Sequence, residues 1–227
     1  MENLPPASVA VVIPTRNREK FLIKILEDLA RQTLKPKIVV VIDSSDTELR
    51  IEKDDLNVVV LYSTIRSAAI QRNKGLDYLK GTEEIYNYCA FLDDDIRIES
   101  DYLSSLTDTL TRTRGAIGIS GLAISENESR YKRNRFLDLV GYSGPEGSLT
   151  RGAINVPVRK ATNPVKVEWL IGCSLWSFIA INSLRFEEDF MGQSIFEDVL
   201  FSIQALKFGF LIVDNNVRFT HHLAVEN

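Results

Sequence analysis

The chain has 227 residues, of which 44% are hydrophobic and 26% are charged, so it is long enough to bury the core of one soluble globular domain. Its net charge of −4 argues against nucleic-acid binding, and we expect no nucleic-acid partner. The longest apolar stretch, residues 169–181, is too short to span a bilayer, and the N-terminus has no basic segment typical of a signal peptide. These features predict a cytoplasmic protein without a transmembrane segment.

The two cysteines, Cys89 and Cys173, lie far apart in the sequence, each within an apolar run. The chain has no Cys-x-x-Cys pair and no Cys/His cluster at zinc spacing. We therefore expect two reduced, buried thiols.

Strands and helices alternate over the first 110 residues. Apolar runs rich in β-branched residues predict buried strands over 8–14, 37–43, 57–62 and 85–92. Apolar residues at intervals of three and four predict helices over 18–32, 67–79 and 100–112. The alternation implies βαβ units, and therefore a parallel sheet with helices on both faces.

The second half of the chain is less regular. Its patterns predict strands over 115–124, 167–181, 210–214 and 217–222 and a helix over 195–208. Residues 126–166 between them carry eight basic and four acidic side chains and a glycine-rich stretch. This basic region could cover a ligand as a lid or bind an anionic acceptor, but solvated surface is the commoner outcome for such charge.

Candidate ligand-binding residues lie at the ends of three of the four strands predicted in the first half. They are Pro14, Thr15 and Arg16 at the end of the first strand, Asp43 at the end of the second, and Asp93, Asp94 and Asp95 after the fourth. Ligands of parallel α/β sheets bind at the carboxyl ends of the strands, so we expect these residues to meet at one edge. A divalent metal would offset the repulsion among the carboxylates, and oxygen ligands would favour Mg²⁺ or Mn²⁺. A solvated acidic loop is the alternative.

Taken in order, several segments make the sequence similar to family 2 glycosyltransferases, which have the GT-A fold. These segments are VAVVIPTRNREKFLIKILEDL, VVVIDSSD, RSAAIQRNKGLDYL, FLDDDIRIESDYL and FEDVLFSIQALKFGF. Each is weak alone, but the five follow the family order over nearly the whole chain. The resemblance implies an α/β fold with a Rossmann-like, mostly parallel sheet. It also implies one domain over residues 1–227, with a nucleotide-sugar-binding half (1–114) and an acceptor-binding half (115–227).

The resemblance implies a non-processive, inverting enzyme that moves one sugar from a nucleotide-diphosphate sugar to an acceptor hydroxyl, with Mn²⁺ or Mg²⁺ as cofactor. The donor would be linked to UDP, GDP or TDP. The acceptor would be a glycan or a lipid-linked molecule used in polysaccharide or glycoconjugate synthesis, which allows for peripheral association with the inner face of the membrane. Two alternatives are a non-catalytic module that binds a nucleotide sugar and an Asp-x-Asp phosphatase.

The resemblance also implies roles for individual residues. Asp198 would be the catalytic base, and Glu197 would orient a neighbour or the acceptor, although acidic residues also favour helix N-termini for electrostatic reasons. Asp95 and Asp93 would hold the metal together with a histidine, for which His221 is preferred over His222.

The nucleotide-sugar site would comprise Pro14, Thr15, Arg16, Asp43, Arg72, Asn73, Asp93 and Asp94. For Arg72, an exposed helical arginine is an equal alternative. In a strand continuing through Asp95, Asp93 and Asp95 would share a face and Asp94 would point to solvent. Trp169 and Gly172 would lie on the acceptor side, with Gly172 inside a strand, whereas Trp176 is more typical of core.

Overall fold

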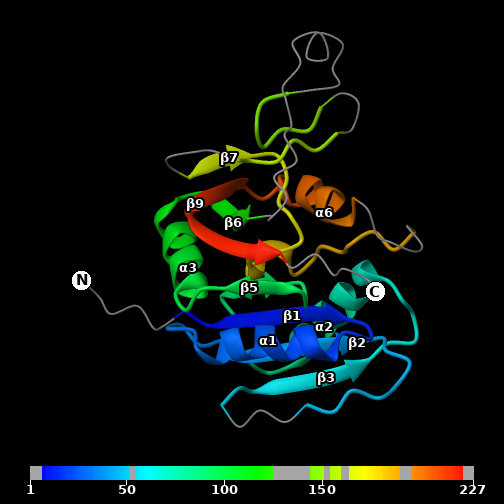
Figure 1. Cartoon of the computed structure of the whole chain (residues 1–227). Helices are drawn as coiled ribbons and strands as arrows, with labels where there is room; N and C mark the ends of the chain where they lie inside the picture. The colour runs from blue at the N-terminus through cyan, green and yellow to red at the C-terminus, as the bar shows by residue number, and fades with distance from the viewer. Residues whose placement is uncertain are drawn as a thin grey trace.

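The computed structural model describes residues 7–51, 55–124, 144–150, 154–159, 164–189 and 196–221 (Figure 1). Its strands are β1 (Val9–Thr15), β2 (Ile38–Asp43), β3 (Val58–Tyr62), β4 (Tyr88–Phe91), β5 (Ile96–Ile98), β6 (Ala116–Ile124), β7 (Val165–Val167), β8 (Ser174–Ser177) and β9 (Phe210–His221). Its helices are α1 (Glu19–Ala30), α2 (Ala68–Gly81), α3 (Tyr102–Arg112), α5 (Phe178–Ile181) and α6 (Glu197–Ala205). Within these ranges, none of the helices has the length and apolar character needed to cross a bilayer.

The described strands form one mixed sheet in the order β3-β2-β1-β4-β8-β6-β9-β5, and β7 pairs with β9. The first four strands run parallel, as predicted. β8 lies antiparallel to both β4 and β6, while β6 and β9 are parallel. Strand β4 therefore joins the parallel half of the sheet to its mixed half.

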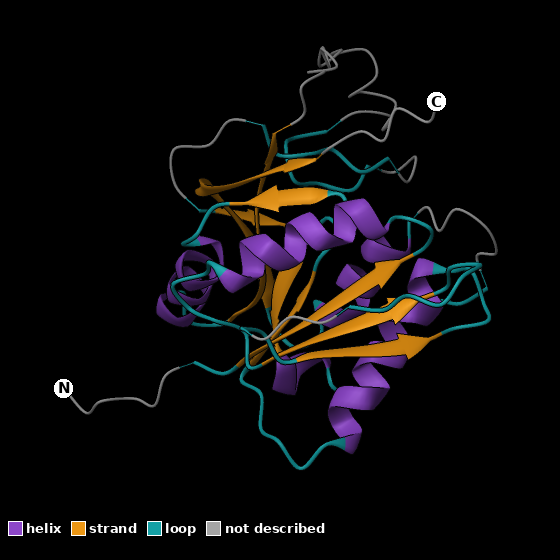
Figure 2. Cartoon of the chain, turned by 60° about the horizontal axis from the view of Figure 1, so that its bottom comes forward, coloured by secondary structure: helices purple, strands orange, loops and turns teal. Residues whose placement is uncertain are grey.

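Helices cover both faces of the sheet, as predicted (Figure 2). Strand β1 shows why, since its fully buried residues alternate between two hydrophobic clusters. Val9, Val11 and Ile13 pack into the cluster that contains α1 and α3, whereas Ala10 and Val12 pack into the cluster that contains α2, α5 and α6. A strand that is apolar on both faces needs such cover on both sides.

The predicted strand boundaries are wrong around the acidic turn. Strand β4 ends at Phe91, and the chain turns at Asp94 and Asp95 before β5 runs antiparallel to β9. Two further predictions fail in the second half. The strand predicted over 167–181 is divided among β7, β8 and α5, and the two short strands predicted over 210–222 are one strand, β9.

Strand β9 continues through a polar stretch that resembles a turn in sequence. The Asp214 carboxylate accepts hydrogen bonds from the Asn216 amide at 3.0 Å and from Thr109 Oγ1 at 2.8 Å. The pairing of β9 with β6 shifts register opposite this stretch, between Gly121 and Leu122. The polar residues therefore form a bulge that bends the strand without ending it.

Helix α2 packs against β1 through Gly75, where an added Cβ would overlap the Val12 side chain. We expect Gly75→Ala to lower the free energy of unfolding by about 1–3 kcal/mol, because a β-branched neighbour in a tight core cannot move aside. Gly81, at the end of the same helix, has no atom within 4 Å of such a Cβ. Gly81→Ala is therefore the matched control, expected to be neutral or slightly stabilising in urea unfolding. Equal stabilities for the two variants would contradict this packing.

Candidate active site

The turns that follow β1 and β2 are locked together at the carboxyl edge of the sheet. Asn17 adopts a left-handed conformation with φ of 53°, which turns the chain from β1 into α1. Its backbone amide donates to Ser45 Oγ at 2.7 Å, and its side chain both donates to and accepts from Asp46. The parallel pairing of β1 and β2 places Thr15 directly opposite Asp43 at this edge, as predicted.

A cavity of about 450 Å³ lies beyond the ends of β2 and β3. Its lining residues are Asp43, Ser45, Asp46, Glu48, Leu49, Val60 and Tyr62. The Asp43 carboxylate is buried, and its Oδ1 accepts from the amide of Ser45 at 2.9 Å and from the Ser45 hydroxyl at 2.5 Å. Arg16 is exposed, with its guanidinium 3.9 Å from the Asp46 carboxylate. The predicted nucleotide side of the site thus borders an open cavity.

Asp94 is buried, so the prediction that it faces solvent is wrong. Its Oδ2 accepts a hydrogen bond from Thr15 Oγ1 at 2.7 Å, and its Oδ1 lies 3.3 Å from Arg18 Nη1. The prediction relied on strand alternation, which ends where the chain turns. Burial raises the pKa of Asp94 to about 6, although the hydroxyl of Thr15 and the charge of Arg18 favour the ionised form.

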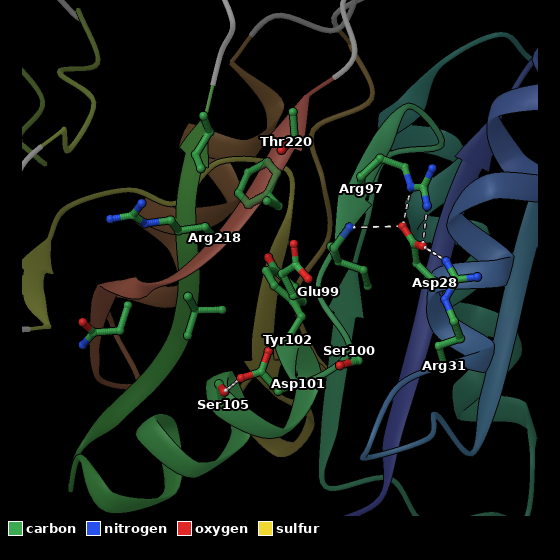
Figure 3. Close-up of a pocket in the computed structure, with 15 residues that line it drawn as sticks. Asp28, Arg31, Arg97, Glu99, Ser100, Asp101, Tyr102, Ser105, Arg218 and Thr220 are labelled. Carbon is green, nitrogen blue, oxygen red and sulfur yellow. Dashed lines mark hydrogen bonds and ion pairs between the residues drawn. The ribbon is translucent and has the colours of Figure 1, made fainter.

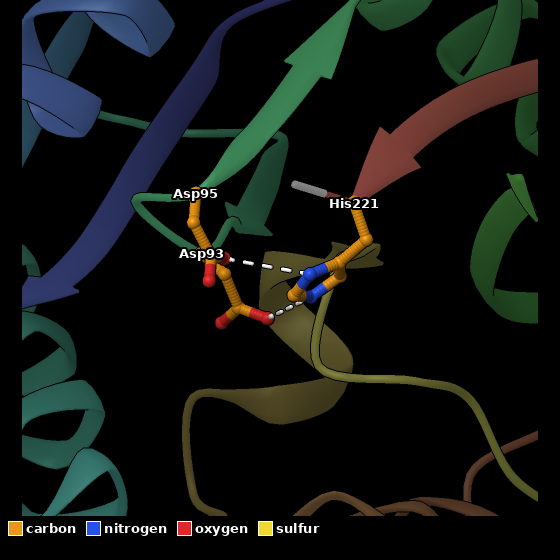
Figure 4. A group of neighbouring side chains, drawn as sticks. All are labelled: Asp93, Asp95 and His221. Carbon is orange, nitrogen blue, oxygen red and sulfur yellow. Dashed lines mark ion pairs between the residues drawn. The ribbon is translucent and has the colours of Figure 1, made fainter. Parts of the chain in front are cut away.

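The side chains of Asp93, Asp95 and His221 converge beside this turn (Figure 4). One potential ligand atom from each lies within 4.8 Å of the others. His221 Nε2 is 3.7 Å from Asp93 Oδ2, and its Nδ1 is 3.6 Å from Asp95 Oδ1. Strand pairing explains the arrangement, because Ile96 stands opposite His221 in the ladder of β5 and β9. The three residues predicted to hold a metal are therefore neighbours, and His222 lies outside the described residues.

Neighbouring charges set the ionisation of this group. Burial opposes the charge on Asp93, but its contacts with His221 and Arg72 hold its pKa below the usual range. The contact with Asp93, supported by the charge of Asp95, raises the pKa of His221. Burial, together with the charge of Asp93, raises the pKa of Asp95.

Arg72 lies at the centre of the acidic residues and is buried, so the alternative of an exposed helical arginine is wrong. Its Nη1 donates to Glu197 Oε1 at 2.9 Å, and its Nη2 donates to Asp93 Oδ1 at 2.8 Å. The guanidinium therefore connects the turn after β4 to the start of α6. Glu197 has this specific partner in addition to any favourable interaction with the helix dipole.

Asp198 is the second residue of α6 and follows a strained turn. Phe196, directly before the helix, has a φ of 81°, which is rare for a bulky residue. Asp198 Oδ1 accepts a hydrogen bond from the Val199 amide at 2.7 Å. Burial and the charge of Glu197 raise the pKa of Asp198 to about 6. A carboxylate with this pKa can take up a proton near neutral pH.

The remaining predicted site residues have mainly structural contacts. The Asn73 side chain donates to Phe186 O at 2.9 Å and accepts from the Phe186 amide at 2.9 Å, which ties that segment to α2. Trp169 is buried and borders a small cavity of about 60 Å³ beside β6. Gly172 lies in the loop before β8 and not in a strand, next to the guanidinium of Arg72.

Three predictions about buried residues are confirmed within the described part of the chain. Trp176 belongs to the core, with its ring edge against Phe201 at a centroid distance of 5.2 Å. Cys89 and Cys173 are free and buried. Cys173 also has a contact that its sequence position did not predict, since its thiol lies 3.3 Å from Asp93 Oδ2.

Two polar residues at this edge were missed by the sequence analysis. Arg18 Nη1 lies 3.0 Å from Asp95 Oδ2, close to its contact with Asp94. Gln71 Nε2 donates to the carbonyl oxygens of Thr15 at 3.0 Å and Ile42 at 2.5 Å, holding the ends of β1 and β2 together. Both lie inside segments that carry the family resemblance, but in the sequence neither has a charge pattern or a spacing that indicates its partner.

The chain has a mixed sheet whose parallel half carries an acidic turn at the carboxyl ends of its strands. The model of the family described as "Glycosyl transferase family 2" matches residues 10–168. The chain therefore belongs to glycosyltransferase family 2, which confirms the resemblance found in the sequence.

Individual relatives are longer than this chain. Glycosyltransferase GlyA of Streptococcus pneumoniae is 31% identical over 127 residues, which cover 53% of this chain and 17% of GlyA. The structure of Staphylococcus aureus TarS 1–349 in complex with UDP-GlcNAc has a TM-score of 0.67 at 18% identity, covering 96% of this chain and 59% of that one. The structure of GalNAc-T7 with UDP, GalNAc and Mn²⁺ has a TM-score of 0.66 at 17% identity. The match covers 96% of this chain and 44% of the GalNAc-T7 chain. These two structures confirm the predicted GT-A fold.

The hydrogen bond from Thr15 to Asp94 is buried, so its loss is expected to reduce stability. Thr15→Val should lower the free energy of unfolding by about 1–3 kcal/mol, because Asp94 loses its hydroxyl donor in a nearly isosteric exchange. Thr15→Ser keeps the hydroxyl and should keep most of the stability. Urea unfolding of both variants tests this, and a Thr15→Val variant as stable as the Ser variant would contradict it.

Proposed function

We propose that this chain is a metal-dependent, inverting glycosyltransferase that moves one sugar from a nucleotide-diphosphate sugar to an acceptor hydroxyl. One observation carries the proposal. Arg72 connects two acidic parts of the structure into one site. One part is the potential metal-binding group of Asp93, Asp95 and His221, called the metal-type group below, and the other is the acidic start of α6. Membership of glycosyltransferase family 2 supports the reaction type. It also favours transfer over the phosphatase alternative.

The donor nucleotide is proposed to bind in the cavity beyond β2 and β3. Asp43 is one of its lining residues, and a carboxylate oxygen can accept a hydrogen bond from a ring N–H of uracil, thymine or guanine. Pro14 lies near the end of β1, paired with Ile42 of β2, and Arg16 follows β1 and contacts Asp46 of the cavity lining. The complexes of TarS with UDP-GlcNAc and of GalNAc-T7 with UDP make a UDP-linked donor the first choice.

The group of Asp93, Asp95 and His221 fits a divalent cation. One potential ligand atom from each residue lies within 4.8 Å of the others, which is close enough for the three side chains to surround one ion. Carboxylate ligands suit Mn²⁺ and Mg²⁺, and the GalNAc-T7 structure contains Mn²⁺. When bound, such an ion would stabilise the charge that develops on the leaving diphosphate.

Asp198 is proposed as the base. Glu197 is bonded to the Arg72 guanidinium, whereas within the described residues the Asp198 carboxylate accepts one hydrogen bond, from the Val199 amide. The acceptor hydroxyl would pass its proton to Asp198 while its oxygen forms a bond to the anomeric carbon. The bond from that carbon to the diphosphate oxygen breaks on the opposite face, which inverts the configuration.

On the acceptor side we propose Trp169 and Gly172, with a glycan or lipid-linked acceptor. The position of Trp169 supports this proposal, because Trp169 borders the small cavity that is also lined by residues of β6 and β9, in the mixed half of the sheet. A non-catalytic module that only binds a nucleotide sugar is the second candidate, and the Asp198 experiment below distinguishes it.

Nucleotide and metal binding test the proposed function directly. We expect the melting temperature to rise with UDP and Mn²⁺ together by more than with either alone, because the diphosphate and the acidic group would share the ion. GDP and TDP, each with and without Mn²⁺ or Mg²⁺, complete the panel. Asp95→Asn should remove the metal-dependent part of the shift and keep much of the shift with nucleotide alone. A wild-type protein that responds to none of the nucleotides would overturn the proposal.

The raised pKa of Asp198 gives a pH prediction. Below about pH 6 this carboxyl is protonated and cannot act as a base, so kcat/KM should fall about tenfold per pH unit on the acid side. Asp198→Asn should lower kcat by about 10²- to 10⁴-fold and leave the Kd for UDP unchanged. It should also remove the decrease of kcat/KM at low pH, which is the acid limb of the pH profile.

Asp94→Asn is the control for that experiment, because Asp94 also has a pKa near 6 but contacts Thr15 and Arg18. The acid limb should persist in this variant. A limb that disappears in Asp94→Asn and persists in Asp198→Asn would reverse the assignment. Unchanged kcat in Asp198→Asn would exclude this residue as the base, and a wild-type protein that binds donor without turnover would indicate the binding module.

A further inference from the structure

Arg72 is a buried cation that bridges two carboxylates of the site. It lies on α2, yet its side chain is only 3% exposed and reaches two carboxylates from opposite parts of the fold. Asp93 belongs to the turn after β4, and Glu197 begins α6 in the second half of the chain. A planar guanidinium can bridge two carboxylates at fixed angles, which an ammonium group cannot.

The guanidinium has close neighbours on several sides, although its Nε is buried without a hydrogen-bond partner among the described residues. A Cβ added to Gly172 would lie 2.7 Å from Arg72 Nη2, so this loop approaches the guanidinium because it has no side chain there. The Phe186 ring lies on another side, with its centroid 5.5 Å from Arg72 Cζ. Asp93 receives a second contact from the thiol of Cys173, the residue after Gly172. The loop before β8 therefore helps to enclose the Arg72 guanidinium.

We infer that Arg72 is a positioning residue that fixes the metal-type group and the acidic start of α6 relative to each other, and that it does not contact the nucleotide. The inference rests on the proposed function. Asp93 is held between Arg72 and His221, and Glu197 is held directly beside Asp198. The bridge thus sets the distance between the residues that face the leaving diphosphate and the residue that takes the proton of the acceptor.

Arg72→Lys tests this inference, because lysine keeps the charge and removes the bridge. The rate of UDP release from the best donor of a nucleotide-sugar panel, with water as acceptor, gives kcat, and calorimetry with UDP and Mn²⁺ gives Kd. We expect kcat to fall about 100-fold and Kd to change less than about threefold, since misplacement of reacting groups by about 1 Å costs rate more than binding. Arg185→Lys is the matched control. Arg185 pairs at the surface with Asp77 of α2, the helix that also carries Arg72, so kcat and the Kd for UDP should stay unchanged.

Gly172→Ala provides a second test in a protein that keeps Arg72. Its methyl group would press on Nη2, so the same loss of kcat with retained UDP affinity is expected. The double variant Arg72→Lys/Glu197→Gln should lose little more than the worse single variant, because both changes break one bridge.

Several results would overturn the inference. Arg72→Lys with wild-type kcat would do so, as would a loss of UDP affinity that accounts for the whole loss of rate, since Arg72 would then be a nucleotide contact. If Arg72→Lys does not fold, a Gly172→Ala variant with wild-type kcat would have the same consequence. A wild-type protein that neither binds nor hydrolyses any donor would overturn the proposed function and this inference together, whereas an active wild type with an unaffected Arg72→Lys variant overturns only the inference.

Discussion

The concentration of negative charge at one edge of the sheet is the constraint on which the site depends. Five carboxyl groups meet there, those of Asp93, Asp94, Asp95, Glu197 and Asp198, and most are largely withdrawn from water. Among the described residues that contact them, Arg72, Arg18 and His221 supply the positive charge. Burial, together with the excess of carboxylates over cations, raises the pKa values of Asp94, Asp95 and Asp198, and a divalent cation would be well accommodated.

The fold brings each cation to this edge by a different route. Arg72 comes from α2, Arg18 from the turn between β1 and α1, and His221 from the last described residue of β9. The acidic turn can reach all three because β4 lies in the middle of the sheet, paired with β1 on one side and β8 on the other. The ladder of β5 and β9 returns to the same turn and is anchored on the far side by Asp28, which accepts two hydrogen bonds from Arg97 (Figure 3).

The parts of the fold with strong local patterns could be predicted from the sequence. The buried strands, the amphipathic helices and the meeting of Thr15, Asp43 and the aspartates follow from periodicity and from the geometry of parallel strands. The group of Asp93, Asp95 and His221 was predicted through the family resemblance. What could not be predicted depends on tertiary contacts. Asp94 is buried because the chain turns, and Arg72 is buried because Asp93 and Glu197, 104 residues apart, both reach it.

Asp94 and Asp198 show why a shifted pKa needs its geometry before it indicates a role. Burial raises the pKa of both to about 6, so this value alone does not separate them. Asp94 is surrounded by its own donors, Thr15 and Arg18, and its carboxylate is used to fix the turn on which Asp93 and Asp95 stand. Among the described residues, the Asp198 carboxylate accepts a hydrogen bond only from the Val199 amide, and the nearby Arg72 guanidinium is bonded to its neighbour Glu197. A carboxylate that is destabilised but not committed to a partner gains most from taking up a proton, which is the property that a general base requires.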